Sequence, residues 1–315
     1  MPIVKRMRVL GALQETVALG TAVSIATSSC NFNAYDIEIQ GAIEYHERSS
    51  IVGSFSNLSG VIGNQSGTLN FKTELFGSGT PGVSPGWATT LLPACGMIET
   101  TGTWSPSSLP PVIAATTGNT QTLTMAVYEN GLRKQLVGCM GDVKLAYAVG
   151  QPIMLEWSFQ GVWQAVTTTA MLTPSALPTR KPIKFATATM SIGGTAPACL
   201  ETFELSLGNE LIMRQCAANS TGYETALVTG RRPVGTWNPE STTPGVAPDD
   251  YALWLAGTEE VLIVAVTDGT DTVTINAPKA MRMNIQEGER TGIQTDQIEF
   301  ALNSATGDDE FTIDF

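Results

Sequence analysis

The sequence predicts a mainly β protein built from two tandem β-barrel or β-sandwich domains, each with one short flanking helix. Val, Ile, Thr and aromatic residues recur in short alternating runs that Gly, Pro, Asn and Asp interrupt, which is typical of strands and turns. The same order of strand, helix and hairpin occurs twice along the chain. A length of 315 residues is enough for about two domains, each with its own core.

The first half begins with an alternating strand and continues through a short helix that ends near Gly96, a residue type common at helix ends. The Asn130-Gly131 pair predicts the tight turn of a long hairpin. The predicted elements are a strand at 35–39, a helix at 85–92, hairpin strands at 122–128 and 134–137, and closing strands at 143–149 and 153–162.

The second half repeats this pattern, with a helix that ends near Gly257 and a hairpin turn at Asp268-Gly269. Its predicted elements are a strand at 203–207, a helix at 249–256, hairpin strands at 262–267 and 272–275, and closing strands at 281–286 and 297–302. Short identities such as Gly67-Thr68 and Gly235-Thr236 support a tandem duplication. Because the first half carries an extra loop near 102–119, the sequence offset between corresponding positions of the two halves is smaller after the helix than before it.

The predicted domain boundaries follow from composition. Residues 1–30 form an N-terminal arm, residues 31–166 the first β domain and residues 183–315 the second. Between them, residues 167–182 are rich in Pro, Thr and Ser, which favours an extended linker.

Charge is sparse and acidic. Charged residues make up 15% of the chain, against roughly 25% in a typical soluble domain, which indicates that other copies cover much of the surface. The net charge of −12 argues against a surface that binds nucleic acid through its phosphates. Most of the excess acid lies after residue 180, and an acidic surface can let DNA pass without adhering to it.

The cysteines and the N-terminus bear on the cell compartment. Five cysteines without any CxxC spacing fit neither a disulfide framework nor a zinc site, and they indicate assembly in a reducing cytoplasm. Lys5, Arg6 and Arg8 precede a semi-apolar run that resembles a signal peptide, but Gln14 and Glu15 interrupt it. No run reaches the ~18 apolar residues of a membrane span, so we expect no membrane binding.

The sequence offers no catalytic constellation. His46 is the single histidine and is interpreted as a solvated side chain at the end of a strand. We predict no catalytic residue, no cofactor and no metal site, although carboxylates distant in the chain leave a glycosidase pair open. Arg231-Arg232 before Pro233 predicts an anion site, an exposed loop or a contact between subunits.

Several segments together resemble the major tail tube proteins of long-tailed, siphovirus-type bacteriophages, in particular the two-repeat kind. The resemblance covers most of the chain and rests on diffuse structural motifs. They are Leu13-Gln14-Glu15-Thr16, 86–92 with 94–97, 138–143, 156–161, 203–209, Gly222-Tyr223, and Arg231-Arg232-Pro233 with Asn238-Pro239-Glu240.

The resemblance implies small β-barrels with a flanking helix, whose rings stack into a tube that conducts phage DNA during ejection. It implies a non-enzymatic virion protein of the tail, assembled in the host cytoplasm. Its partners would be other copies of itself, the tape measure and the tail terminator, with DNA only in transit through the lumen. With two repeats per chain, a ring of three copies is favoured over a ring of six.

A long hairpin loop and the N-terminal arm reach the next ring in that family. We therefore expect contacts between rings at the arm and at the polar loop 49–66, and contacts within a ring at the paired arginines. The inter-ring candidates are Lys5, Arg6, Arg8, Ser54, Asn57 and Asn64, and the inter-subunit candidates are Arg231 and Arg232. The alternative is a viral or cell-surface β-sandwich, such as a decoration protein or an adhesin stalk, that forms no tube.

Overall fold

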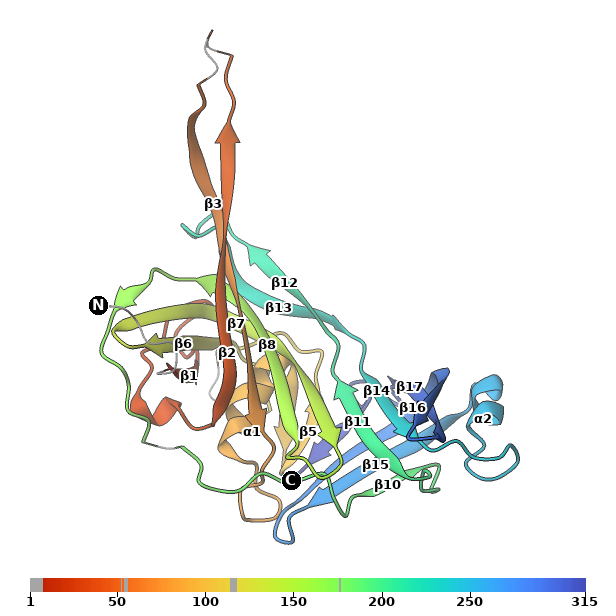
Figure 1. The fold of residues 1–315 in the computed structure, drawn as a ribbon. Helices are drawn as coiled ribbons and strands as arrows, with labels where there is room; N and C mark the ends of the chain where they lie inside the picture. The colour runs from red at the N-terminus through yellow and green to blue at the C-terminus, as the bar shows by residue number, and fades with distance from the viewer. Residues whose placement is uncertain (1–7, 52, 54–55, 114–117, 176) are drawn as a thin grey trace.

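The computed structural model describes residues 8–51, 53, 56–113, 118–175 and 177–315 (Figure 1). Within these residues the chain is mainly β with two short α-helices, as the sequence predicts. The first half contains α1 (Gly86–Leu91), the 3-10 helices η1 (Thr27–Ser29) and η2 (Leu92–Cys95), and the strands β1 (Arg8–Gln14), β2 (Ala34–Arg48), β3 (Leu58–Glu74), β4 (Met97–Thr100), β5 (Thr103–Pro106), β6 (Leu123–Glu129), β7 (Leu132–Ala148), β8 (Met154–Trp163) and β9 (Thr167–Thr168).

In the second half, as in the first, an α-helix lies between β-strands along the chain. It contains α2 (Asp250–Ala256) and the strands β10 (Thr189–Ile192), β11 (Leu200–Ser206), β12 (Asn209–Gln215), β13 (Tyr223–Arg231), β14 (Val234–Pro239), β15 (Glu259–Thr267), β16 (Thr272–Arg290), β17 (Ile293–Asn303) and β18 (Thr312–Asp314).

Local signals in the sequence explain both helices and both hairpin turns. Each helical segment ends at a glycine with a left-handed backbone, Gly96 with φ 75° and Gly257 with φ 62°. Asp249 caps α2 by accepting a hydrogen bond from the amide of Ala252 at 3.1 Å. The predicted hairpins are present as β6–β7 and β15–β16, with turns at Asn130-Gly131 and Asp268-Gly269.

One sheet of 16 strands runs through both halves instead of closing into a barrel in each. Its main path places β2-β3-β8-β7 of the first half directly beside β11-β14-β17-β16 of the second. Beside β7 lie β6 and then β1, and beside β16 lie β15 and then β10. The expected barrels are absent from the described residues because β7 continues its hydrogen bonding into β11 across the two halves.

The main hydrophobic core lies on one face of this sheet and extends through both halves, and a smaller separate cluster contains Ile25, Ala126 and Tyr128. In the first half Phe71 stacks between Phe32 and Phe159, and Trp157 packs against the buried Trp87 of α1. In the second half Trp237 packs edge-on against Phe300. Tyr147 and Phe203, from opposite sides of the β7–β11 junction, are in contact, so the core crosses the junction as the sheet does.

The sequence misjudged two segments. Residues 8–14 of the expected arm form β1, which pairs with β6 and buries Leu10 and Ala12. Residues 58–66 of the expected polar loop belong to β3, because their pairing with β2 forms a long two-stranded hairpin. Gly, Ser and Asn hide the alternation in that stretch, and a two-stranded ribbon exposes both faces, so no apolar face was needed to form it.

Candidate assembly surfaces

The β2–β3 hairpin projects away from the body of the molecule (Figure 1). Large apolar side chains on its outer part are exposed: Ile43 by 50%, Tyr45 by 59%, Val61 by 54% and Ile62 by 57%. Monomeric soluble proteins rarely expose a group of large apolar side chains, so this hairpin is a candidate surface for contact with another molecule. Its exit from the body is marked by Gly41 opposite Gly67.

The corresponding hairpin of the second half, β12–β13, lies instead against the first half (Figure 1). It bends away from β11 and β14 at Gly208, with φ 62°, and at Pro233. Asn209 Nδ2 donates to the carbonyl oxygens of Cys95 at 2.8 Å and Gly141 at 2.9 Å. Thr225 Oγ1 donates to the carbonyl of Gly138 at 3.0 Å, so this hairpin is held by buried and partly buried polar contacts.

Among the open sheet edges in the described part of the chain, two belong to long strands of the main path, β2 and β16. Strand β2 pairs only with β3, and residues 282–290 of β16 pair only with β17. Unpaired edges of this length present rows of backbone N–H and C=O groups that can pair with another chain. Strand β2 is one end of the main path, whereas the path continues past β16 through β18 and β5 to β4, so in β16 only the part after residue 281 is open.

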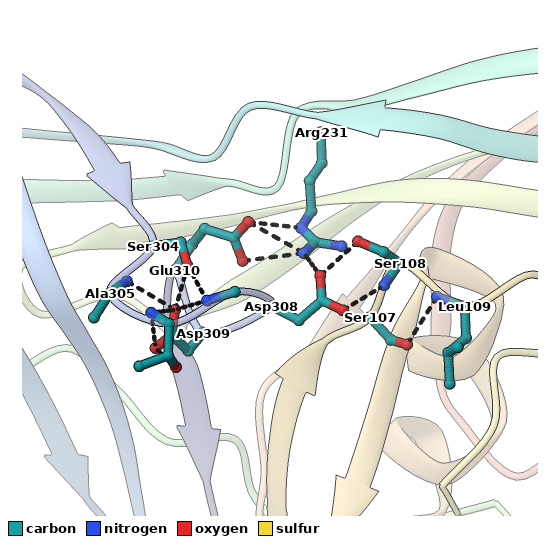
Figure 2. Close-up of polar contacts among 11 residues, drawn as sticks. Ser107, Ser108, Leu109, Arg231, Ser304, Ala305, Asp308, Asp309 and Glu310 are labelled. Carbon is teal, nitrogen blue, oxygen red and sulfur yellow. Dashed lines mark hydrogen bonds and ion pairs between the residues drawn. The ribbon is translucent and has the colours of Figure 1, made fainter.

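Arg231 joins the second half to the C-terminal segment and to a loop of the first half (Figure 2). Its guanidinium bonds Asp308, and its Nε and Nη2 donate to Glu310 Oε1 at 3.2 and 3.1 Å. Asp308 also accepts from the amide of Ser108 at 3.0 Å. Partial burial raises the pKa of Asp308, but the bonds from Ser108 and Arg231 outweigh it and lower that pKa below its usual value.

The predicted contact residues therefore separate into three groups. Lys5, Arg6 and Ser54 lie outside the described residues. Arg8 and Arg231 bind their own chain, Arg8 through an ion pair to Glu129 at 2.5 Å and a bond to the Ile37 carbonyl at 2.6 Å. Exposed positions are Asn57, at the hairpin tip, and Arg232, whose Nη2 lies 3.8 Å from Met283 Sδ.

Asn64 is the remaining candidate, and it faces its own chain. It lies half-buried on β3 beside the tip of β12–β13, where its neighbour Gln65 donates a backbone bond to Thr221 O at 3.0 Å. The arginine roles were missed from the sequence because their acidic partners lie far along the chain, at a separation of 77 residues for Arg231 and Asp308.

Nothing among the described residues forms a metal centre, since no three His, Cys, Asp or Glu side chains gather at one point there. His46 lies on the exposed hairpin, with Nε2 3.8 Å from Glu44 Oε2. The cysteines are free thiols, and burial raises the pKa of Cys95 and Cys139 well above the usual value, so neither is a nucleophile. No helix in the described ranges has both the length and the apolar character required to cross a bilayer.

In a comparison with protein-family models, residues 6–304 match the phage tail tube protein family. The chain belongs to the phage tail tube protein family. A search of curated proteins finds no matching sequence. This tail tube protein is a structural, non-enzymatic component of the virion tail, and its family implies self-assembly into a tube. The prediction of a tail tube subunit is thus confirmed, in preference to a decoration protein or an adhesin stalk.

Proposed function

We propose that this chain is the major tube subunit of a siphovirus-type tail, of the two-repeat kind, and that its stacked rings conduct DNA during ejection. The observation that carries the proposal is the strand order. The path β2-β3-β8-β7 and the path β11-β14-β17-β16 list corresponding strands of the two halves in the same order. Two tube-like domains, at 31–166 and 183–315, with an arm at 1–30 and a linker at 167–182, account for that order.

The β7–β11 junction supplies a template for joining one copy to the next. There, residues 144–148 of β7 pair antiparallel with residues 202–206 of β11, and Lys144 Nζ bonds Glu204 Oε2 at 2.7 Å. In the repeat, β2 corresponds to β11, and β16 corresponds to β7. Strands β2 and β16 both have an open edge. We infer that β16 of one copy pairs with β2 of the next.

A ring closed in this way holds three copies and six domains. Three equivalent junctions between chains alternate with three junctions within chains, which gives three-fold symmetry with a pseudo-six-fold sheet. The alternative is a ring of six copies in which the first domain alone lines the bore. We favour three because both halves supply four strands to one sheet, as a shared lining requires.

The face of this sheet opposite the core is the proposed lining of the lumen. Outward side chains on it are mostly polar or acidic, and its lysines are paired, Lys72 with Glu156 at 2.8 Å and Lys144 with Glu204. Its acidic side chains include Glu38, Glu74, Glu156, Glu204 and Glu299. Charges are screened over about 8 Å at physiological salt, so only carboxylates near the DNA path keep phosphates from adhering.

Contacts between rings are proposed at the arm, through Lys5 and Arg6, and at the hairpin tip around Asn57. Arg8 and Arg231 are better explained by the bonds that they make within the chain. Further proposed partners are the tape measure and the tail terminator, met during assembly in the host cytoplasm.

The mass of a single ring tests the stoichiometry. Native mass spectrometry of rings assembled from the purified chain should give about three times 33.3 kDa. A ring of six times that mass would reject the three-copy ring and leave tube formation intact. Electron microscopy that finds stable monomers and no rings or tubes at any concentration would reject the proposed function itself.

A further inference from the structure

The two halves differ in what covers the end of their helices. In the first half Ala94, two residues before the left-handed Gly96, is fully buried, and the β12–β13 hairpin covers this region. A side chain at Gly96 would lie 3.9 Å from Val228 of β13. In the second half Leu255, two residues before the left-handed Gly257, is 86% exposed. The same place in the fold is therefore covered in one half and bare in the other.

The bare region forms a small apolar surface. Leu255 follows Trp254 in α2, and the indole N–H of Trp254 donates to the carbonyl of the half-buried Met283 of β16 at 3.0 Å. We call this the α2–β16 surface, made of Leu255 and Met283. Across the described part of the chain, only Arg232 reaches Met283 with a side-chain bond, and nothing buries Leu255.

The molecule also contains a hairpin that lacks a corresponding partner. Strands β12–β13 lean from β11–β14 back over β7 and reach β3, where Thr221 O accepts from Gln65 N. The equivalent hairpin, β2–β3, carries exposed Tyr45, Val61 and Ile62, and among the described residues no strand other than β3 pairs with β2, so its β2 side is open.

We propose that the β2–β3 hairpin of one copy lies across the α2–β16 surface of a second copy, as β12–β13 lies across the helix end and β7 within the chain. The occupant is the hairpin of another copy because placing the β2 of that copy beside β16 continues the β7–β11 arrangement and brings its β2–β3 hairpin to the α2–β16 surface. The inference rests on the proposed ring. It adds the surface on which each hairpin stem rests, and the tip keeps its inter-ring role.

Glycines at the base of the β2–β3 hairpin are consistent with the bend that this hairpin needs in order to reach the α2–β16 surface. Gly41, Gly67 and Gly161 lie side by side on three strands, and Trp163 packs over Gly41 and Gly67. A Cβ at Gly41 would lie 2.9 Å from the Trp163 ring, so these positions keep the base thin where the hairpin must bend. In the second half, Gly208 and Pro233 already hold the bend.

Single charges placed on either side of the proposed contact test it. Leu255→Asp and Ile62→Asp alter exposed side chains, so each monomer should fold with an unchanged melting temperature. Each should raise the concentration for half-assembly by ~10-fold or more, since an unpaired charge is left in an apolar contact. Val166→Asp is the matched control, because Val166 is 45% exposed and lies outside both surfaces.

Cross-linking identifies the pair of surfaces directly, with Cys199 and Cys216 replaced by serine. A chain with Leu255→Cys is mixed with a chain carrying either Val61→Cys or Ile62→Cys, and the mixture is oxidised after assembly. Neighbouring strand positions face opposite sides, so Ile62→Cys should link to Leu255→Cys and Val61→Cys should not.

The outcomes separate the two proposals. Rings from the unaltered chain together with normal assembly of Leu255→Asp and Ile62→Asp, or with no cross-link from either hairpin position, would overturn this inference and leave the ring standing. Failure of the unaltered chain to form rings or tubes would overturn the proposed function, and the inference with it.

Discussion

Arg282 occupies the interior of the second half with its side chain fully buried. Nε bonds Asp250 Oδ1 at 2.7 Å, Nη1 bonds Glu260 Oε2 at 2.8 Å, and the guanidinium lies 5.8 Å from the centre of the Phe300 ring. Burial raises the pKa of Asp250, with Arg282 acting in the opposite direction. This arrangement ties the start of α2 to β15 and β16.

Removing that guanidinium leaves two carboxylates without their partner. Arg282→Met should lower the free energy of unfolding by ~3–5 kcal/mol, because breaking a buried ion pair leaves uncompensated charge inside. Urea denaturation measures the loss. Arg232→Met, at an exposed arginine, should change stability by about 0.5 kcal/mol or less. Equal effects of the two substitutions would contradict the structural role of Arg282.

Glu15 is a buried carboxyl that fixes the segment after β1. It accepts from the amides of Gly20 and Gly138, both at 2.7 Å, and from the hydroxyls of Thr122 at 2.7 Å and Thr124 at 3.1 Å. Glu15→Gln places an amide donor among these donors and should destabilise the chain by ~1–3 kcal/mol. Chemical denaturation at neutral pH measures the loss, and no change would show that the four bonds contribute nothing to folding.

The same carboxyl predicts a pH dependence. Burial raises the pKa of Glu15 above its usual 4.5, although the four donors oppose this. A carboxyl with a raised pKa contributes its stability fully below the unfolded pKa, and that part is lost as pH rises through the folded pKa. Stability of the unaltered chain should therefore fall just above pH 4.5 by an amount that Glu15→Gln abolishes. Parallel stability–pH curves for the two proteins would refute this.

At the level of elements, the strand β1 determines which N-terminal deletions leave the chain able to fold. Removing residues 2–20 takes away β1, the buried Leu10 and the bonds of Glu15, so that variant should fail to fold. Removing residues 2–7 leaves β1 in place and should give folded subunits whose tubes are shorter. Circular dichroism and electron microscopy separate the two effects. Tubes of normal length from the 2–7 deletion would remove the arm from the proposed inter-ring contacts.

Elements with a local signal could be predicted from the sequence, and elements that depend on distant partners could not. The Asn130-Gly131 and Asp268-Gly269 turns and the two helices are encoded within a few residues. The outer part of β3 depends on pairing with β2 and shows no alternation of its own. Arg231 was predicted to contact another subunit, whereas the structure pairs it within the chain with Asp308 and Glu310, which the return of the C-terminal segment brings to it.

At the level of the whole molecule, the two halves share both a sheet and a core. Beyond the β7–β11 junction, the last strand β18 pairs with β16 on one side and with β5 on the other, and Phe315 packs against Trp87 at 5.6 Å. Because so much of the buried surface is common to both halves, we expect one cooperative unfolding transition. Calorimetry that resolves two separate transitions would show that the halves unfold independently.

The two domains that meet at the β7–β11 junction belong to one chain, and this covalent connection affects the entropy of assembly. Two domains held in one sheet cannot diffuse apart, so half of the six contacts of a proposed ring exist before any encounter between molecules. Each remaining association costs translational and rotational freedom once per chain, not once per domain, and this loss amounts to several kcal/mol or more per event. A ring of three fused pairs can therefore form at a lower subunit concentration than a ring of six separate domains with equally strong contacts.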